Sequence, residues 1–507
     1  MNQTIVFLGL TAVVITYLVT LYGRKGSSKY RLPPLVPGIP IFGNALQVPP
    51  TQQGPWAKEL AEKYGEMFTV KFGGATWVFL NSSRVVTDLM EKRAAIYSSR
   101  PPFPMTQDIM SGGGRVVLMP YGEKWRKTRK VMHQILSTRQ KDTFSKFQDL
   151  ESKHLLYDYL HNPDRWFSAN GRYSNSIIMS VVFGVRSKLD DPEVTKLFET
   201  AEMFLEQQQP GANIVDGFPV LARLPNVLQW WRPKGERMFH YTRQQVEPHQ
   251  LDKLKLRMEK GEQRECFAAD FIRSNDDNYF DENSQLFVLG SLMEAGSDTT
   301  RVSIYDMIAA AATYPDWVER ARAQLDKVCG ANAERLPEWS DREDLPYITA
   351  TVKEIFRWRP NLAEIGAPTS LTQDDEYEGY RFPKGTVFVW NAWAIALDPR
   401  EYAEPERFYP ERFLNDDLNN PLKGHWGFGP GRRVCVGWNV GEGNVWIAVA
   451  RLLYCFNFIE DKANPIDTMR IPQIAKNKAP FQVKIEVRSP GHAALIERTC
   501  LDAVNAP

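Results

Sequence analysis

A single cysteine near the C-terminus lies in a loop rich in glycine and arginine. Residues 428–437 have the sequence Phe-Gly-Pro-Gly-Arg-Arg-Val-Cys-Val-Gly, and the cysteine is residue 435. Gly431 and Gly437 let the backbone pass close to a flat cofactor and point amide N–H groups at the sulfur. A thiolate held in this way can bind a haem iron and favours the cleavage of O2 over its transport. The loop therefore indicates haem-thiolate chemistry, with an inert buried thiol as the alternative.

The fixed positions of this loop resemble the haem-binding signature of cytochromes P450, Phe-x-x-Gly-x-Arg-x-Cys-x-Gly. They are Phe428, Gly431, Arg433, Cys435 and Gly437. Five matches in one short window are poorly explained by chance. The resemblance implies that Cys435 is the axial ligand of haem b, and Arg433 can reach a haem propionate.

A second motif, Ala-Gly-Ser-Asp-Thr-Thr at residues 295–300, falls in the middle of a helix expected over residues 283–313. A helix interior gains little stability from glycine, an acid or an alcohol, so their grouping indicates a functional site or a kink. The motif is similar to the family's oxygen-activation motif. We expect Gly296 to leave room for O2 and a water, Thr299 to hydrogen-bond the distal oxygen, and Asp298 to relay protons.

A third motif pairs two charges on a helix that begins after Pro346 and ends by Pro360. Glu354 and Arg357 stand three residues apart on one face of this helix, which alone often means a solvated pair. The later segment Pro-Glu-Arg-Phe at residues 410–413 resembles the family segment that adds a third charge. The predicted triad is Glu354, Arg357 and Arg412, and the same tetrapeptide five residues earlier offers Arg407 as the alternative.

Trp125 and Arg129, spaced as Trp-x-x-x-Arg on a probable helix, would both point toward one haem edge and bind a propionate. An amphipathic basic helix is the alternative. Lys127 and Lys130 on the same segment could attract the acidic flavin domain of a reductase. The chain departs from the family pattern at Thr369-Ser370, where many relatives have a histidine or arginine. A hydroxyl or another cation would have to replace it.

By position, residues 103–117, 204–220 and 362–365 resemble the substrate-contacting regions of the family. Their apolar side chains suit a large lipophilic ligand. Glu364 could hold an amine or hydroxyl of the substrate, or pair with an arginine. The candidate pocket residues are Phe103, Met105, Ile109, Ala295, Leu362 and Glu364.

Composition narrows the function classes. The 507 residues contain no low-complexity linker, so residues 45–507 are expected to form one catalytic domain. Lys+Arg 62 against Asp+Glu 61 gives a net charge of +1, which argues against a nucleic-acid partner. The five cysteines form no Cys-x-x-Cys pair, which argues against zinc and iron–sulfur sites and for a reducing compartment.

Residues 5–22 carry no charge and, as a helix of about 27 Å, could cross the endoplasmic reticulum membrane once. We predict a signal-anchor transmembrane helix at residues 1–23; a cleaved signal peptide is the alternative. Arg24, Lys25, Lys29 and Arg31 follow it and favour a cytosolic catalytic domain. Residues 24–44 form a basic and proline-rich hinge between the two.

The predicted fold is mainly α with small β-sheets (α+β), the cytochrome P450 fold with one N-terminal transmembrane helix. Most segments look helical, while residues 68–72 and 76–80 predict a hairpin around Gly73-Gly74. Residues 386–390 and 481–487 predict further strands.

The resemblance covers nearly the whole chain and is strongest to membrane-bound fungal members of secondary metabolism. It implies a monooxygenase that inserts one oxygen atom of O2 into a lipophilic alkaloid, polyketide or terpenoid. Because no nicotinamide fold is evident, electrons from NADPH must come through a separate cytochrome P450 reductase. The alternatives are a haem-thiolate isomerase or dehydratase, which the Asp298-Thr299 pair disfavours, and a non-catalytic membrane protein that binds haem or a sterol.

Overall fold

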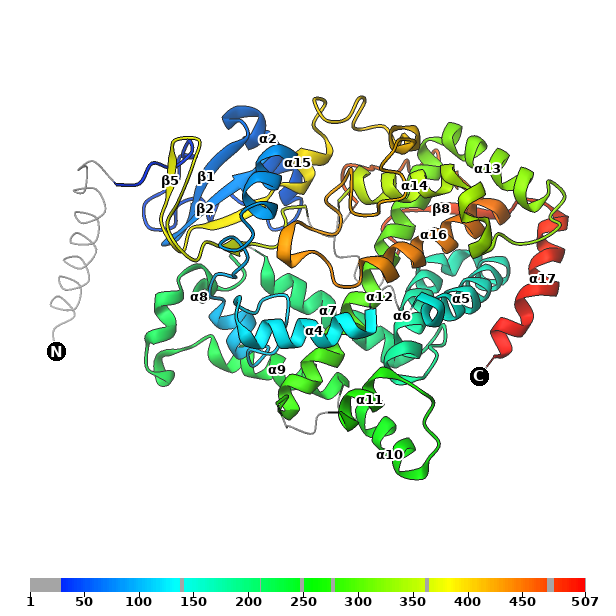
Figure 1. Cartoon of the computed structure of the whole chain (residues 1–507), viewed down its shortest axis with the longest axis horizontal. Helices are drawn as coiled ribbons and strands as arrows, with labels where there is room; N and C mark the ends of the chain where they lie inside the picture. The colour runs from blue at the N-terminus through cyan, green and yellow to red at the C-terminus, as the bar shows by residue number, and fades with distance from the viewer. Residues whose placement is uncertain are drawn as a thin grey trace.

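A 32-residue helix, α12 (Glu282–Thr313), runs through the middle of the molecule (Figure 1). The computed structural model describes residues 29–136, 141–209, 211–246, 250–274, 279–360, 364–471 and 478–506. The Asp281 side chain caps α12 by accepting a hydrogen bond from Ser284 N at 2.7 Å. The helix ends where Pro315 opens α13 (Pro315–Cys329), so the predicted helix over residues 283–313 is confirmed.

Helices α6 and α16 pack on α12, α5 packs on both of them, and α17 packs on α5; together with α12 they form much of the main hydrophobic core. Every residue of α6 except Ser168 is buried, including serines, asparagines and an arginine. Buried polar groups of this kind need hydrogen-bond partners, and neighbouring helices supply them. The four helices are α5 (Lys141–His161), α6 (Trp166–Phe183), α16 (Trp438–Cys455) and α17 (Pro490–Asn505).

The remaining helices cover this core or join it to the sheets. Longer ones are α2 (Gln53–Tyr64), α4 (Glu123–Leu136), α7 (Pro192–Gln208), α9 (Arg232–Val246), α10 (Asp252–Lys260), α11 (Phe267–Arg273) and α14 (Pro346–Trp358). Short ones include α3 (Ser83–Val86), η1 (Thr87–Glu91), η2 (Pro104–Ile109), α8 (Ile214–Gly217), α15 (Ala392–Ala396), η10 (Pro410–Phe413) and η11 (Gly431–Arg433).

The largest sheet lies at the end of the molecule opposite α17 (Figure 1) and has the strand order β1-β2-β6-β3. The predicted hairpin is confirmed as the antiparallel pair of β1 (Met67–Phe72) and β2 (Ala75–Leu80). Gly73 turns between them with φ +56°. The other strands are β3 (Thr369–Ser370), β4 (Asp375–Tyr377), β5 (Tyr380–Phe382), β6 (Val387–Trp390), β7 (Phe456–Glu460) and β8 (Val483–Val487).

The mainly helical fold with small sheets is therefore confirmed. From Pro33 onward the predicted hinge lies along β1: Val36 N donates to Thr69 O at 2.9 Å, and Thr69 N donates to Pro34 O at 2.8 Å. Part of the hinge is thus attached to the body. No helix within the described ranges is both long and apolar enough to span a bilayer. The predicted transmembrane helix at residues 5–22 lies outside those ranges.

Candidate active site

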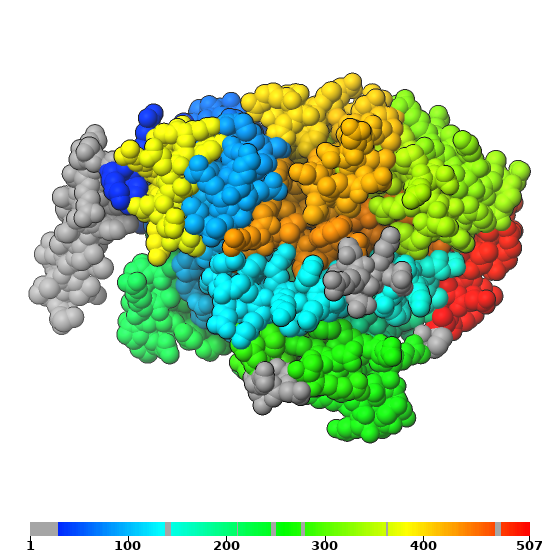
Figure 2. Space-filling model, in the orientation of Figure 1, coloured from blue at the N-terminus to red at the C-terminus, as the bar shows by residue number. Residues whose placement is uncertain are grey.

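The loop that carries Cys435 is shaped by close backbone packing. Cys435 N donates to Phe428 O at 2.8 Å, and η11 occupies the turn between them. At Gly431, with φ +64°, a Cβ would lie only 2.0 Å from the carbonyl oxygen of Met90. Gly431 is therefore required by the approach of the loop to η1, and no cofactor is needed to explain it. In Figure 2 this segment, in orange, reaches the surface beside α4, in cyan.

Cys435 differs from the other cysteines in being exposed, whereas Cys266, Cys329, Cys455 and Cys500 are buried. Protein atoms still crowd its sulfur, and this desolvation raises the pKa of the Cys435 thiol. The backbone N–H of Gly437 and the charge of Arg129 act in the opposite direction. The thiol is therefore accessible and has donors that favour its thiolate form.

Three arginines gather beside this loop without a carboxylate. Arg433 donates to the carbonyls of Ser98 and Met119, both at 2.7 Å, and Arg100 donates to the carbonyl of Val117 at 2.7 Å. Arg129 donates to the carbonyl of Val434. The structure forms no ion pair for any of the three within the described part of the chain. Among the described residues, the hydrogen bonds of this group, which we call the arginine cluster, go only to backbone carbonyls.

The arginine cluster is electrostatically strained. Burial, together with the nearby charges of Arg100 and Arg129, lowers the pKa of Arg433 to about 8. Burial lowers the pKa of Arg100 to about 10. The Nη1 atom of Arg433 is buried and has no hydrogen-bond partner. A buried donor without a partner is rare and costs about 1–3 kcal/mol.

These features fit the predicted cofactor. An anion with several carboxylate oxygens would satisfy Arg433 Nη1 and neutralise its neighbours. The guanidinium of Arg433 also lies 4.2 Å from the ring centroid of Trp125, which brings the predicted Trp125 into the same group. Haem combines two carboxylates with an iron that takes a thiolate, so the donor set of the arginine cluster and Cys435 suits it.

Around its centre, α12 has two exposed residues between buried ones. Ala295 and Thr299 are exposed, while Ser297, Asp298 and Thr300 are buried. The hydroxyl of Thr299 donates to the carbonyl of Ala295 at 2.8 Å. Residues four apart share a helix face, so these two positions form an open strip on α12.

Gly296 has a different role from the predicted one. A Cβ at this position would lie 2.7 Å from Cγ1 of Ile178 on α6. The glycine therefore permits α6 to pack closely on α12, and Ile178 lies where a Cβ of residue 296 would point. Asp298 also has a partner that the sequence prediction did not include: Arg301 donates to its Oδ1 from Nε at 2.9 Å and from Nη2 at 2.6 Å.

The structure brings together the three residues of the predicted charge triad. Arg357 donates to both carboxylate oxygens of Glu354 at 2.7 Å, and Arg412 Nε lies 3.2 Å from the same carboxylate. Glu354 and Arg357 are fully buried. Arg357 also donates to the carbonyls of Ala396 and Pro405, which ties α14 to the segment that leads to the Cys435 loop. The alternative residue, Arg407, is partly exposed and pairs with Asp316 and Glu404.

The predicted pocket residues lie in several environments. Met105 and Phe103 pack in a cluster with Phe204, Val215 and Trp231. Ile109 belongs to the same cluster and faces α9, since a Cβ on Gly235 would lie 2.6 Å from it. Residue Leu362 lies outside the described ranges.

The prediction for Glu364 is not supported. Its Oε2 accepts a hydrogen bond from Gly54 N at 2.7 Å, so the carboxylate caps α2. Neither a substrate group nor an arginine is needed to explain it. At the position where the chain departs from the family pattern, Thr369 Oγ1 donates to Phe388 O at 3.3 Å within the sheet. Arg100 donates to the carbonyls of Ala367 and Pro368 and places a cation beside this segment.

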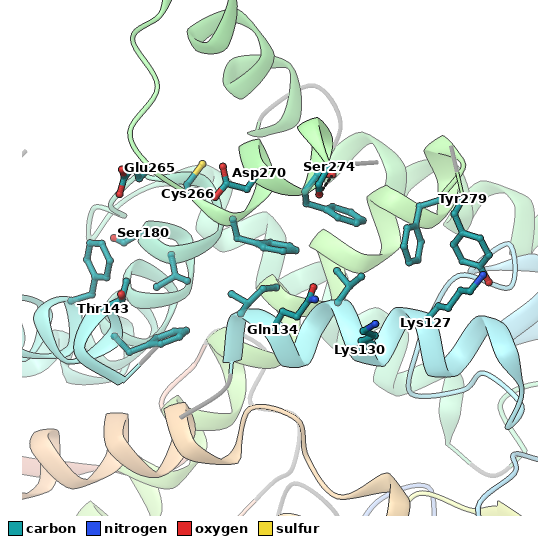
Figure 3. A pocket seen from close by; sticks show the side chains of 18 residues that line it. Lys127, Lys130, Gln134, Thr143, Ser180, Glu265, Cys266, Asp270, Ser274 and Tyr279 are labelled. Carbon is teal, nitrogen blue, oxygen red and sulfur yellow. Dashed lines mark hydrogen bonds between the residues drawn. The ribbon is translucent and has the colours of Figure 1, made fainter. Parts of the chain in front are cut away.

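The two lysines predicted as a reductase-binding face line a separate cleft. This cleft, of about 850 Å³, lies between α4 and α11 and is lined in part by aromatic side chains. Figure 3 shows Lys127 and Lys130 on α4 and Asp270 across the cleft on α11. The ammonium of Lys127 lies 3.7 Å from the ring centroid of Tyr279 and pairs with Glu123. Two exposed cations, Arg126 on α4 and Arg432 in the Cys435 loop, contact Tyr121.

Sequence reasoning missed two arginines. Arg100 has no periodic pattern around it, and only its fold neighbours identify it. Arg301 could have been found, because it stands three residues after Asp298, the same spacing that singled out Glu354 and Arg357.

Comparisons with known proteins bear on the site as a whole. Residues 33–485 match the family model described as Cytochrome P450. The chain is similar to the cytochrome P450 monooxygenase verL of Clonostachys rogersoniana, with 34% identity over 97% of this chain and 93% of that protein. It is similar to the cytochrome P450 monooxygenase patI of Penicillium expansum, with 35% identity over 90% of this chain and 88% of that protein. It also resembles the cytochrome P450 monooxygenase fogE of Aspergillus ruber, with 31% identity over 87% of this chain and 82% of that protein.

Proposed function

Because this chain belongs to the cytochrome P450 family and is a monooxygenase, we propose that it oxidises a lipophilic secondary metabolite at a haem b bound by Cys435. The reaction inserts one atom of O2 into the substrate and releases the other as water. NADPH supplies two electrons through a separate reductase. The substrate class proposed is an alkaloid, polyketide or terpenoid, in keeping with the fungal relatives.

The observation that carries this proposal is the arginine cluster beside an exposed cysteine. Arg433 Nη1 is a buried donor that awaits an acceptor, and the cluster holds three like charges with no counter-ion in the described chain. Arg433, Arg100, Arg129 and Trp125 would hold the two haem carboxylates, and Cys435 would hold the iron. When bound, the haem supplies the activation of O2.

Residues of α12 would contribute the groups that bind O2 and deliver protons. The open strip of Ala295 and Thr299 leaves space for O2, and the Thr299 hydroxyl can turn from the Ala295 carbonyl to donate to it. Asp298, which immediately precedes Thr299 in the chain, takes a proton from water and passes it toward Thr299. The buried triad of Glu354, Arg357 and Arg412 fixes the backbone that precedes the Cys435 loop.

We propose that the reductase approaches the face formed by Arg126 and Arg432. Both are exposed, and both lie against Tyr121 near the Cys435 loop. Lys127 and Lys130 lie along the α11 cleft and are not included.

Membrane attachment, with the catalytic domain in the cytosol at the endoplasmic reticulum, is proposed from residues 5–22 and from exposed apolar side chains. Two groups of these side chains are linked through Phe218, which precedes the second group in the chain and whose ring lies 6.0 Å from that of Phe42. They are Leu35, Ile39, Phe42 and Leu46 in one group and Val220, Val227, Leu228 and Trp230 in the other. Exposed apolar patches of this kind favour contact with a lipid surface.

The reduced carbon monoxide difference spectrum tests the proposal. The wild type should give the red-shifted Soret band of thiolate ligation, and Cys435→Ser should lose it while retaining the fold. Cys266→Ser, a buried cysteine in the α11 cleft, is the matched control and should keep the band. A haem-loaded wild type without the band would overturn the assignment of Cys435. Reductase-supported turnover of alkaloid, polyketide and terpenoid panels then defines the substrate.

A further inference from the structure

Arg301 binds the acid of the oxygen-activation motif from within the same helix. Only 4% of its surface is exposed, and two of its nitrogens donate to one oxygen of Asp298. A buried arginine and carboxylate with this geometry form a strong, directional contact. The carboxylate of Asp298 is therefore held in one position, although the proposed function expects this carboxylate to pass protons.

Three helices fix the guanidinium. Its central carbon lies 3.9 Å from the ring centroid of Phe198 on α7 and 4.7 Å from that of Phe167 on α6. At Gly171 of α6, a Cβ would lie 3.1 Å from the Phe198 ring and 3.5 Å from Cδ of Arg301. The glycine thus leaves the space that this stack occupies.

A second carboxylate shares the same cation. Glu202 on α7 lies 3.9 Å from Arg301 Nη2, the atom that also donates to Asp298. Both carboxyl side chains are largely buried. Arg301 therefore divides its charge between α12 and α7, which weakens its hold on either acid.

Asp298 and Thr299 face different directions. Successive residues of a helix are about 100° apart, so when Thr299 lies on the open strip, Asp298 points toward α6 and α7. Its bonded partner, Arg301, is on that side. To deliver a proton toward Thr299, the carboxylate must leave Arg301 and turn, and the strength of the Arg301 contact controls how readily it does so.

We propose that Arg301 is a positioning residue for proton delivery by Asp298, and that Glu202 on α7 sets the strength of that contact. The inference rests on the proposed function, because it assumes that Asp298 passes protons during O2 reduction. Arg301 holds the carboxylate in place, and Glu202 competes for the guanidinium and eases release.

The test uses oxidase turnover of the haem-loaded, full-length protein with its reductase and no added substrate. Two reactions consume NADPH: O2 + NADPH + H⁺ gives H2O2 and NADP⁺, and O2 + 2 NADPH + 2 H⁺ gives two H2O and two NADP⁺. Rate, peroxide yield and solvent deuterium isotope effect are measured together. Asp298→Asn should slow turnover by about 10²-fold and raise the isotope effect.

Arg301→Gln should slow turnover by about tenfold with a raised isotope effect, and Arg301→Lys should recover most of the rate because it restores the cation. Glu202→Gln should slow turnover about two- to threefold, since Arg301 then holds Asp298 alone. In the Arg301→Gln background, Glu202→Gln should not change the isotope effect further, because the proposed influence of Glu202 on Asp298 passes through Arg301.

Two controls separate positioning from general damage. The rate of forming the reduced carbon monoxide complex should stay at the wild-type value in every variant, since it needs electrons but no proton delivery. Arg488→Gln, which breaks a bidentate pair with Asp326 far along the chain, should leave the isotope effect unchanged.

The inference is overturned if Asp298→Asn raises the isotope effect but Arg301→Gln and Arg301→Lys leave it unchanged, or if Glu202→Gln and Arg301→Gln act additively. If Asp298→Asn itself changes nothing, the proposed proton role of Asp298 fails first. A missing thiolate Soret band would instead point to Cys435.

Discussion

Buried and half-buried arginines occur in two contrasting settings in this protein. In the arginine cluster, Arg100, Arg129 and Arg433 donate only to carbonyl groups, and one donor has no partner. Elsewhere, Arg301 and Arg357 each bind a carboxylate at 2.6–2.7 Å. In the second setting the protein itself supplies a carboxylate for each arginine. In the first setting the described residues supply none, so an added anion would be needed to neutralise the charge. The donor without a partner, Arg433 Nη1, therefore marks where an anionic group would bind.

The largest effect is expected from removing one member of the buried charge triad. Glu354→Ala strands the fully buried Arg357 and Arg357→Ala strands Glu354, and either should cost about 3–5 kcal/mol of unfolding free energy. The backbone before the Cys435 loop would then shift, so haem content should fall with the melting temperature. Arg407→Ala, an exposed neighbour, is the control and should change neither. Normal haem content in both triad variants would refute the structural role of the triad.

Arg433→Ala removes the buried donor that awaits an acceptor. We expect haem binding to weaken by about 1.5–3 kcal/mol, roughly 10- to 150-fold, because a charge-assisted hydrogen bond is lost. The adjacent Arg432→Ala removes an exposed arginine that donates to Tyr121 and should leave haem retention intact. Transfer of haem to an apo-globin acceptor measures both. Equal retention in the two variants would mean that the unpartnered donor faces no carboxylate.

Double-mutant cycles give the sign of each contrast. In haem-free protein, removing either Arg100 or Arg433 relieves the same repulsion, so the double alanine variant should be more destabilised than the sum of the two single variants. Asp298→Asn and Arg301→Gln each remove the same attraction, so their coupling should have the opposite sign. We expect each coupling energy to be about 0.5–3 kcal/mol in magnitude. Binding haem should abolish the first coupling and leave the second unchanged. Thermal unfolding with and without haem tests this, and two couplings that respond alike would remove the distinction between the settings.

Much of the fold followed from local signals in the sequence. Asp281 and Pro315 bound the long helix, and the Gly73 turn joined the predicted hairpin. The triad could be proposed because two of its members stand on one helix face. What failed were inferences about the direction of a side chain: Gly296 faces Ile178, and Glu364 caps α2. One helix position or loop conformation decides such directions, and tertiary packing sets both.

The arginine cluster was only partly predictable for the same reason. Arg433 and Arg129 belong to recognisable motifs, but Arg100 joins them from a loop more than 300 residues before the cysteine. Loops that converge in space leave no periodic signal in the sequence. Because Thr369-Ser370 stand where many relatives have a histidine or arginine, the sequence left open which cation replaces it. In the structure, Arg100 lies beside that segment.

The smallest expected effect concerns arginines that are unpaired but exposed. Arg126 and Arg432 lie beside the Cys435 loop, yet water solvates them, so their lack of a carboxylate carries no large penalty. Neutralising both should leave stability and haem content unchanged and reduce reductase-supported NADPH oxidation about two- to fivefold at low salt, with less difference at high salt. Neutralising Lys127 and Lys130, which line the α11 cleft, should leave that rate and its salt dependence unchanged. If the lysine pair gave the larger, salt-sensitive loss, the reductase would approach over the cleft. Burial would still distinguish the arginine cluster from the two exposed arginines and the two lysines, because water solvates the exposed cations, whereas Nη1 of Arg433 is buried without a partner among the described residues.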